Sequence, residues 1–326
     1  MEPPRPDEPL HRVTIPEALA GRRLDLALAR LLPDYSRARI QAWIRAGRVR
    51  VGGAPRRPRD PVRAGERVEV RAEAPAPLED RPQALDLEIL HEDDHLLAVN
   101  KPPGLVVHPG AGNREGTLLN ALLHHVPGAS RLPRAGLVHR LDKDTSGVLV
   151  VAKTPAAHTR LVAALQARQI RREYLALVLG EVIAGGTVEA PVGRHPVHRT
   201  RMAVVPGGRP AVTHYRVSRR LGALTLLRVR LETGRTHQIR VHMAHIGHPV
   251  AGDPVYGGRS RLPRGLDARA RAALAAWRRQ ALHARRLELA HPVTGRPLCW
   301  EVQPPADFAA LLETLDSPHR ADLDPA

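Results

Sequence analysis

Cysteine and aromatic residues are scarce in this chain of 326 residues, and each scarcity excludes a kind of protein. The one cysteine, Cys299, excludes an internal disulfide and a cysteine-based zinc finger. Aromatic residues make up 2% of the chain, too few for a surface that binds single strands by stacking alone. The chain has no run of about 18 apolar residues, and its first residues lack the apolar core of a signal peptide. We therefore expect a cytoplasmic enzyme or binding protein without a membrane span.

Positive charge exceeds negative charge by a wide margin. Lysine and arginine together number 50, against 33 aspartate and glutamate residues, which gives a formal net charge of +17. A small soluble domain usually carries a net charge of magnitude about 2–8, so solubility alone does not account for this excess. The charge predicts a polyanionic partner, and therefore nucleic acid.

Two helical patterns follow a charged, proline-rich start. Residues 1–12 are expected to be disordered, because they hold too few apolar side chains for a core. From Leu24 the apolar residues recur at helical spacing until Pro33 stops them. Ser36 is placed to cap a second helix, which Gly47 ends.

Short strand patterns complete a small basic domain over residues 13–71. The strands are expected at 49–51 and 68–70, separated by a turn rich in glycine and proline. Two short helices packed on such a hairpin form a compact unit with arginines on its solvent side. The candidate RNA-binding residues of this unit are Arg37, Arg39, Arg45, Arg48 and Arg50. The alternative is a solvated basic face on a generic helical hairpin.

A larger domain follows a linker. Residues 72–84 combine prolines with mixed charge and predict a semi-rigid linker, residues 85–314 form the larger domain, and residues 315–326 form a loose tail. We expect strands near 96–99, 175–179 and 227–231 and helices near 117–125, 155–169, 236–246 and 268–280. Antiparallel-looking strand pairs mixed with helices predict an α+β fold, with a mixed, mainly antiparallel sheet and flanking helices.

The most informative stretch of the chain surrounds Asp142. An apolar run ends in a cluster of Asp, Thr, Ser and Gly before a second apolar run begins, which predicts a strand, a tight loop and a strand. Arg140 and Lys143 flank Asp142, and nearby cations favour the ionised carboxylate. Such an aspartate suits a nucleophile better than a proton donor. The alternative is that Asp142 pairs with Arg140 while its neighbours satisfy turn amides.

The segment His139-Arg140-Leu141-Asp142-Lys143-Asp144-Thr145-Ser146-Gly147 resembles the catalytic motif of the RluA-type pseudouridine synthases. Three further segments resemble the other motifs of that family in the same order, at residues 101–109, 173–178 and 233–242. The resemblance implies that Asp142 starts the reaction at the ribose, by attack or by proton removal. It also implies that Tyr174 packs against the target base, that Arg240 is the partner of Asp142, and that no metal, nucleotide or redox cofactor takes part.

Substrate recognition requires groups beyond these three. A base inside paired RNA must be flipped out to be reached, at a cost of about a few kcal/mol in unstacking. By the same resemblance Arg140 fills the gap that the base leaves, and the alternative is that Arg140 simply pairs with Asp142 or Asp144. Arg235 lies at the entrance of an expected helix, where an anion is favoured, and His139 adjoins Arg140, so both are further substrate-binding candidates.

Histidines crowd one segment near the fourth motif and raise the question of a metal site. They are His237, His242, His245 and His248. The nearest carboxylates in sequence, Glu232 and Asp253, lie outside the cluster, whereas Arg235 and Arg240 fall in or beside it. We therefore expect no metal.

The combined features predict an isomerase that makes pseudouridine in structured RNA. The N-terminal unit resembles the small RNA-binding domain first described in a ribosomal protein of the small subunit. This combination is most similar to the RluD-type members of the family, which modify large-subunit ribosomal RNA, so that RNA or its assembly intermediates is the expected partner of a monomeric enzyme. The alternatives are an RNA-binding or ribosome-assembly factor without catalysis and, less favoured, a metal-dependent nuclease.

Overall fold

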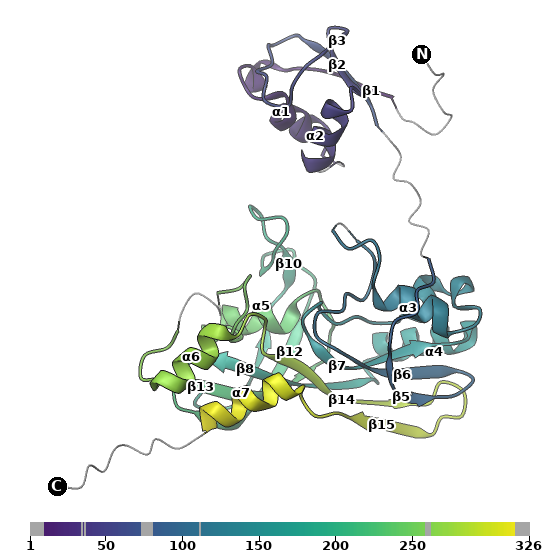
Figure 1. The fold of residues 1–326 in the computed structure, drawn as a ribbon, viewed down its shortest axis with the longest axis vertical. Helices are drawn as coiled ribbons and strands as arrows, with labels where there is room; N and C mark the ends of the chain where they lie inside the picture. The colour runs from purple at the N-terminus through teal and green to yellow at the C-terminus, as the bar shows by residue number, and fades with distance from the viewer. Residues whose placement is uncertain are drawn as a thin grey trace, which may run out of the picture. The chain divides into compact units, whose positions relative to one another are not determined.

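The computed structural model describes residues 10–33, 35, 37–72, 81–110, 112–257 and 262–316. The chain divides into two compact units, residues 1–79 and 80–326, and each is described by itself (Figure 1). Several expectations fall outside the described residues: the helix cap at Ser36, linker residues 73–80, and tail residues 1–9 and 317–326.

The N-terminal unit is a four-stranded sheet packed against two helices. Its elements are β1 (Leu10–Thr14), the 3-10 helix η1 (Glu17–Leu19), α1 (Leu24–Leu31), α2 (Arg37–Arg45), β2 (Val49–Val51), β3 (Ala54–Pro55) and β4 (Arg67–Arg71). The strands pair antiparallel in the order β1-β4-β2-β3, so the sheet is larger than the expected hairpin. Leu28, Ile40, Trp43 and Val68 are buried in one core that joins the helices to the sheet.

The prediction that residues 1–12 are disordered is wrong for residues 10–12, which belong to strand β1. Leu10 of β1 pairs with Arg71 of β4, and the Arg12 guanidinium forms an ion pair with the Glu69 carboxylate at 3.0 Å. The prolines and charges of residues 1–9 dominate the composition of this end of the chain. Composition therefore gives no sign of a strand whose partner lies more than 50 residues later in the sequence.

The C-terminal unit is built on one nine-stranded sheet. Its elements are β5 (Glu88–Glu92), β6 (Leu96–Lys101), α3 (Leu118–His125), η2 (Ala129–Arg131), η3 (Pro133–Gly136), β7 (Ser146–Ala152), α4 (Pro155–Gln166), β8 (Arg171–Leu179), β9 (Gly186–Glu189), β10 (Val192–Arg194), β11 (Met202–Val204), β12 (Val212–Leu221), β13 (Leu224–Leu231), α5 (Gln238–His245), α6 (Ala268–Ala276), β14 (Leu282–Ala290), β15 (Pro297–Glu301) and α7 (Ala306–Asp316). The strand order is β5-β6-β7-β14-β8-β13-β12-β9, with β15 paired to β14, and β10 pairs separately with β11. Within the sheet β7 and β14 run parallel and the other described pairs are antiparallel, so the predicted α+β class with a mixed, mainly antiparallel sheet is confirmed.

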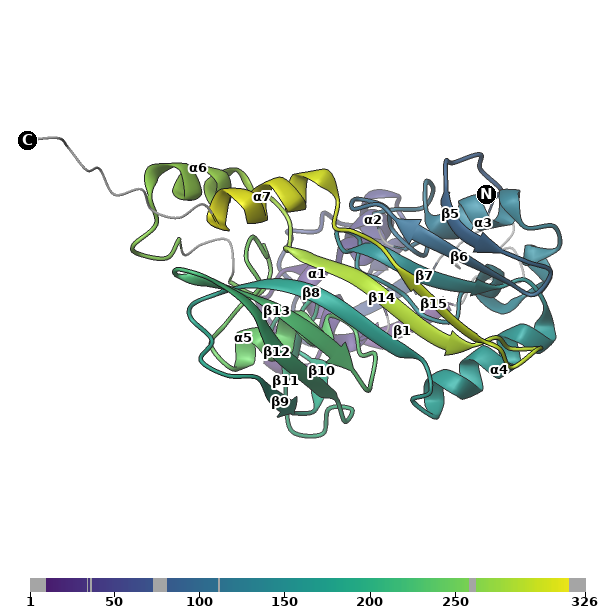
Figure 2. The same cartoon turned by 90° about the horizontal axis from the view of Figure 1, so that it is seen from below.

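The two faces of this sheet carry different helices because successive side chains of a strand point to opposite sides. Tyr174 and Ala176 of β8 pack with α3 and α5 on one face, where the Asp142 loop also lies. Leu175 and Leu177 of the same strand pack with α6 and α7 on the other. Helix α4 packs through Leu161 against β6, β7 and β14. Figure 2 shows α6 and α7 lying next to each other along the sheet.

Both ends of the C-terminal unit differ from the sequence prediction. Residues 81–83, expected in the linker, are tied to α3, since the Asn120 side chain donates to the carbonyl of Arg81 and Gln83 N donates to the carbonyl of Asn120. At the other end, Leu315 is buried in the last turn of α7 and Asp316 closes that helix. The helical spacing of apolar residues in α7 continues from Leu311 to Leu315, so the helix extends past the predicted domain end at residue 314.

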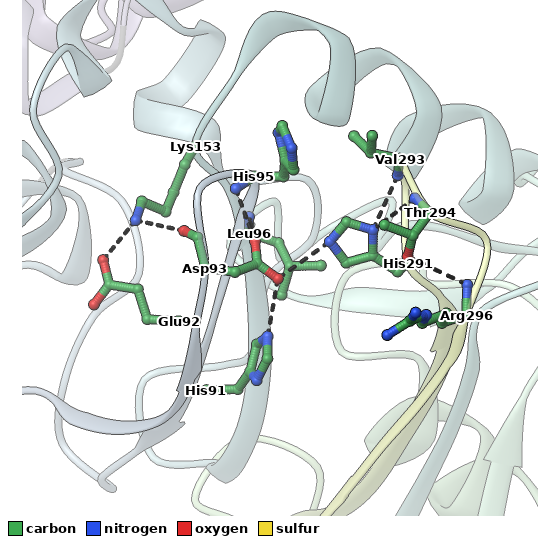
Figure 3. A network of polar contacts seen from close by, with 10 residues as sticks. All are labelled: His91, Glu92, Asp93, His95, Leu96, Lys153, His291, Val293, Thr294 and Arg296. Atoms are coloured by element: carbon green, nitrogen blue, oxygen red, sulfur yellow. Dashed lines mark hydrogen bonds and ion pairs between the residues drawn. The ribbon is translucent and has the colours of Figure 1, made fainter.

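A carboxylate joins two hairpin turns of this unit. Asp93 lies between β5 and β6, and its Oδ1 accepts hydrogen bonds from the backbone N–H groups of His95 (2.7 Å) and Leu96 (2.9 Å). Its Oδ2 accepts from the Nε2 atoms of His91 (3.0 Å) and His291 (3.1 Å), and His291 belongs to the β14–β15 turn (Figure 3). Burial opposes ionisation of Asp93, but these hydrogen bonds outweigh it and hold the pKa of Asp93 well below its usual range.

The ring of His291 can satisfy this arrangement while neutral. Its Nδ1 accepts hydrogen bonds from the backbone N–H groups of Val293 (3.1 Å) and Thr294 (2.9 Å), so its proton lies on Nε2 and points to Asp93. The Nε2–H group of His291 therefore links the β14–β15 turn to Asp93 in the β5–β6 turn, and this hydrogen bond does not require a charged histidine.

Replacement of this carboxylate is expected to destabilise the unit. Asp93→Asn should lower the free energy of unfolding by about 2–3 kcal/mol at pH 7, since hydrogen bonds to a charged group are worth about 1.5–3 kcal/mol. Because the folded-state pKa is depressed, this stability is present above the unfolded pKa of about 3.9 and is lost as the pH falls below it. Urea unfolding at pH 7 and pH 3 should show the difference shrinking at the lower pH. Asp94→Asn, at the exposed neighbour in the same turn, is the control, and an equal loss in both variants would contradict the assignment.

Candidate active site

A pocket of about 520 Å³ lies in the C-terminal unit where the Asp142 loop, β8 and the turn before α5 meet. It is lined by every residue of this unit that the sequence puts forward for catalysis or substrate binding, namely His139, Arg140, Asp142, Tyr174, Arg235 and Arg240. These residues lie as much as about 100 positions apart in the sequence, and the fold brings them to one place.

The loop that carries Asp142 differs from the expected strand-loop-strand. The helix η3 precedes it, Leu137 forms only an isolated bridge with Val151, and regular pairing begins at Ser146 in β7. Leu137 and Leu141 are buried in the core of the unit. A short apolar run fits a buried coil as well as a strand, which is why the pattern misleads here.

A buried lysine anchors this loop to the first motif. Lys101 is fully buried, and its Nζ donates to the carbonyl oxygens of Pro102 (2.8 Å), Leu105 (2.9 Å) and Lys143 (2.8 Å). Burial lowers the pKa of Lys101 to about 7. The bond to Lys143 fixes the backbone directly after Asp142, so Lys101 acts on the site by holding the loop in place.

The glycine that ends the motif allows two strands to approach closely. Gly147 has φ 115°, and a Cβ at this position would lie 2.1 Å from the carbonyl oxygen of Ala284 in β14. Next to it, the Ser146 hydroxyl forms a hydrogen bond with Nδ1 of His283 at 2.9 Å. Ser146 and Gly147 therefore serve the contact between β7 and β14, which sets the position of the loop before them.

Asp142 forms an ion pair with Arg240 and not with Arg140. Nη1 of Arg240 donates to Oδ2 of Asp142 at 2.9 Å. The other edge of the same guanidinium donates to both carboxylate oxygens of Asp253, at 2.7 Å and 2.9 Å. Arg240 and Asp253 are buried, whereas Asp142 remains 15% exposed to the pocket. The guanidinium is thus held by Asp253 and presents its remaining donors to Asp142.

A second chain of polar groups reaches Asp142 from the other side. The backbone N–H of Met202 donates to the Tyr256 hydroxyl at 3.0 Å, and Tyr256 in turn lies 2.8 Å from Nδ1 of His237. Nε2 of the same ring lies 3.8 Å from Oδ1 of Asp142. Burial lowers the pKa of His237, so the ring is neutral at pH 7.

The turn before α5 is closed by the side chain of the first residue of that helix, Gln238. His237 precedes the helix with φ 57°, in the left-handed region that a residue with a side chain rarely adopts. The side chain of Gln238 accepts from the backbone N–H of Arg235 (3.0 Å) and from the Thr233 hydroxyl (2.8 Å), and so closes the turn. This strained turn points the His237 ring at Asp142.

The remaining predicted residues occupy the wall and the rim of the pocket. Tyr174 is 6% exposed in the middle of β8, and burial raises its pKa, so the phenol stays protonated. Arg140 is exposed at the rim. Arg235 donates from Nε to the carbonyl of Pro210 at 3.1 Å and lines the pocket.

The clustered histidines have separate protein partners. His242 is fully buried and lies 2.9 Å from both the Thr213 hydroxyl and the carbonyl of Ala190, while His248 bonds the carbonyl of Leu179. Within the described ranges no group of three or more His, Cys, Asp or Glu side chains stands close enough to hold a metal ion.

The arginines of the N-terminal unit fall into structural and exposed groups. Arg37 bonds the buried Asp25 at 2.9 Å. Burial opposes ionisation of Asp25, but hydrogen bonds from Arg23, Gln41 and Arg37 lower its pKa to about 2. The guanidinium of Arg39 lies 5.1 Å from the ring of Trp43. Arg45 and Arg50 are exposed and Arg48 is half-buried, and Arg45 borders a groove together with Arg23, Arg57 and Arg59.

The structure adds two residues that the sequence did not single out. Asp253 and Tyr256 lie in the loop after α5, and Oδ1 of Asp253 also accepts from the backbone N–H groups of Val255 (2.8 Å) and Tyr256 (3.2 Å). The sequence offered only a weak signal, a carboxylate 13 residues after Arg240.

None of the helices in the described part of the chain is long and apolar enough to cross a membrane. An ion-paired aspartate at the wall of a pocket, beside a buried tyrosine, is the arrangement of an enzyme active site, and the comparisons with known proteins identify the family. The family model described as RNA pseudouridylate synthase matches residues 95–245, and the S4 domain model matches residues 22–68. The chain therefore belongs to the RNA pseudouridylate synthase family and isomerises uridine to pseudouridine in RNA.

Relatives match over nearly the whole chain. A "Ribosomal large subunit pseudouridine synthase D" of Pseudomonas aeruginosa is 56% identical over 301 residues, which cover 92% of this chain and 94% of the relative. The protein of the same name from Escherichia coli K12 is 53% identical, with 95% of this chain and 94% of the relative covered. Among solved structures, human RNA Pseudouridylate Synthase Domain Containing 4 matches with a TM-score of 0.55 and 28% identity over 70% of this chain and 92% of that chain.

Proposed function

We propose that this protein converts specific uridines of large-subunit ribosomal RNA to pseudouridine, with Asp142 starting the reaction at the ribose. The observation that carries the proposal is the ion pair between Asp142 and Arg240 inside a pocket that also holds Tyr174. The ion pair holds the carboxylate in one orientation at the wall of the pocket. The RNA target is inferred from the names of the relatives, which match over more than nine-tenths of the chain.

The reaction is an isomerisation, so atoms are conserved. The bond from uracil N1 to ribose C1′ breaks, the base turns, and uracil C5 bonds to C1′. C5 then loses its proton, and N1 gains one. Asp142 either attacks C1′, in which case the Asp142–C1′ bond breaks when C5 bonds to C1′, or removes a ribose proton and returns it to the ribose afterwards. Arg240 holds the carboxylate in place for either role. Tyr174 packs against the base, and Arg140 at the rim fills the space that the flipped base leaves in the RNA.

The test compares ribosomal RNA with and without this protein. Chemical mapping of pseudouridine in cells that lack the protein should show specific large-subunit uridines left unmodified. The purified protein should restore them on RNA or assembly intermediates from those cells. Restoration only in transfer RNA would contradict the ribosomal target, and no product on any RNA would contradict the enzyme assignment. We further propose that the protein acts as a cytoplasmic monomer without a metal, which sedimentation and turnover after dialysis against a chelator would check.

The groove bordered by Arg45, Arg57 and Arg59 suits RNA phosphates, and we propose it as part of the RNA-binding surface. Replacing these three exposed arginines with glutamine should weaken RNA binding. Removal of each arginine that binds a phosphate should flatten the plot of log affinity against log salt by about 0.7–0.9. Turnover at saturating RNA should stay unchanged, because phosphate contacts position the substrate without entering the chemistry.

The control for this triple variant is Arg12→Gln, which removes an arginine of the same unit that is paired with Glu69. Fluorescence anisotropy at several salt concentrations measures the slope for each variant. An unchanged slope in the triple variant would mean that the groove is only solvated surface.

A further inference from the structure

Arg172, which has no role in the mechanism proposed above, is a buried cation on the wall of the active-site pocket. It is 8% exposed, and no ion pair joins it to a carboxylate of the described residues. Its Nε is buried and has no hydrogen-bond partner among those residues. A buried guanidinium without a carboxylate partner is costly in free energy, so a group of this kind beside a pocket indicates that a ligand supplies the partner.

The position of Arg172 is fixed by its strand and by a turn. Arg172 and Tyr174 are two residues apart in β8, so their side chains point to the same face of the sheet. On its other side the guanidinium lies against Gly234, where a Cβ would come within 2.8 Å of Nη1. The glycine thus leaves room for Arg172 next to the site of the base.

His139, which also lines the pocket, carries a second donor without a partner among the described residues. Its Nε2 accepts a hydrogen bond from the backbone N–H of Val150 at 3.1 Å, so the proton of the neutral ring lies on Nδ1. Burial and the nearby charge of Arg172 lower the pKa of His139 to about 3, so the ring is neutral at pH 7. Nδ1 is buried and has no acceptor within the described part of the chain. Two residues of the same pocket wall thus carry donors that no acceptor of the described residues satisfies.

We propose that Arg172, assisted by His139, binds the oxygens of the uracil ring and stabilises the negative charge that the base carries while it is detached from the ribose. When the N1–C1′ bond breaks, its electron pair remains on the base and is shared with the two carbonyl oxygens. The same electrons then form the C5–C1′ bond, the C5 proton is lost and N1 is protonated. Preorganised donors aimed at developing charge are a major source of catalysis.

The burial of Arg172 favours the base over a phosphate as its ligand. Arg140 and Arg168 of the same pocket are exposed, where the RNA backbone can reach them. Arg172 instead shares the strand and the face of Tyr174, the residue proposed to pack against the base. The inference rests on the proposed role of this pocket and adds a catalytic residue to it.

The test uses the full-length protein and two RNAs that differ at the target nucleotide. The first carries uridine. The second carries 5-fluorouridine, whose fluorine withdraws electrons and already stabilises the charge on the detached base. Arg172→Met should lower kcat on the uridine RNA by about 10²- to 10³-fold with little change in KM, as for loss of one charge-stabilising donor. The fall in the rate of forming a carbon-linked nucleoside from the 5-fluorouridine RNA, measured by mass spectrometry, should be clearly smaller.

Two further variants make the result specific. Arg171→Met removes the adjacent arginine, which points away from the pocket with 73% of its side chain exposed, and should leave both rates unchanged. Arg172→Lys keeps the charge and should recover part of the lost rate. Should Arg172→Met fail to fold, Arg172→Lys and Arg172→Gln on the two RNAs supply the same comparison.

The contrary outcomes are distinct. A rise in KM alone for Arg172→Met would indicate that Arg172 binds a phosphate. Equal falls in rate on both RNAs would indicate that it only positions the substrate, and full activity would show that it takes no part in the reaction. Each of these results would overturn the proposal. Failure of the unaltered protein on every RNA would instead contradict the proposed function.

Discussion

Asp142→Asn is expected to reduce turnover by at least about 100-fold, on the scale of the catalytic contribution of a single acid or base. The amide is isosteric with the carboxylate but can neither attack the ribose nor accept its proton. Arg240 keeps its two hydrogen bonds to Asp253 in the variant, so the pocket should retain its shape. Single-turnover assays at saturating RNA measure the loss, and thermal unfolding and RNA affinity should stay close to those of the unaltered protein.

Asp144→Asn is the matched control for this prediction. Asp144 lies two residues further along the same loop, and the hydrogen bond that holds it uses its carbonyl oxygen, 3.4 Å from Nη1 of Arg279. We expect a much smaller loss of turnover. Residual activity of Asp142→Asn above about one percent of the unaltered rate would remove Asp142 from its proposed role.

Asp253→Ala should be the most destabilising substitution of those considered. It leaves the buried Arg240 without its two-point partner, and removing one member of a buried ion pair costs about 3–5 kcal/mol. It also removes the acceptor for the backbone N–H groups of Val255 and Tyr256. Urea unfolding should show this loss of free energy, and turnover should fall with it because Arg240 no longer holds Asp142 in place.

Two comparisons identify the cause of that loss. Asp307→Ala removes a 53% exposed carboxylate that pairs with Arg279, and should cost about 1 kcal/mol or less. The double variant Asp253→Ala, Arg240→Met removes the uncompensated charge as well, and should regain much of the lost stability while remaining inactive. A double variant as unstable as Asp253→Ala would show that the charge is not the reason.

The sequence predicted those helices and strands that the spacing of their own apolar residues determines. The helical spacing after Leu24 and the alternation from Leu227 to Leu231 each correspond to an element of the structure. Strand β1 and the buried coil at Leu137 were not predicted correctly, because distant partners decide whether an extended segment pairs or packs.

Some residues of the candidate site could likewise be predicted from the sequence, and others could not. Asp142, Tyr174 and Arg240 could be chosen because they stand in recognisable motifs, and they line one pocket. Their roles in the reaction stay predictions. Asp253 and Arg172 could not be chosen, since one depends on the path of the chain after α5 and the other on an unmet hydrogen-bonding need. Neither property is visible in a linear sequence.

The strand order β7-β14-β8 has a consequence for the synthesis of the protein. β14 lies between two strands that precede it in the chain by more than 100 residues, and it joins the part of the sheet beside Asp142 to the part that carries Tyr174. A nascent chain that has not yet reached Leu282 therefore holds two separate groups of strands and lacks the element that brings the pocket together. Pairings over such separations form late in folding. The ribosome must therefore extend the chain beyond β14 before the pocket can form, and a copy that ends before Leu282 lacks the assembled site.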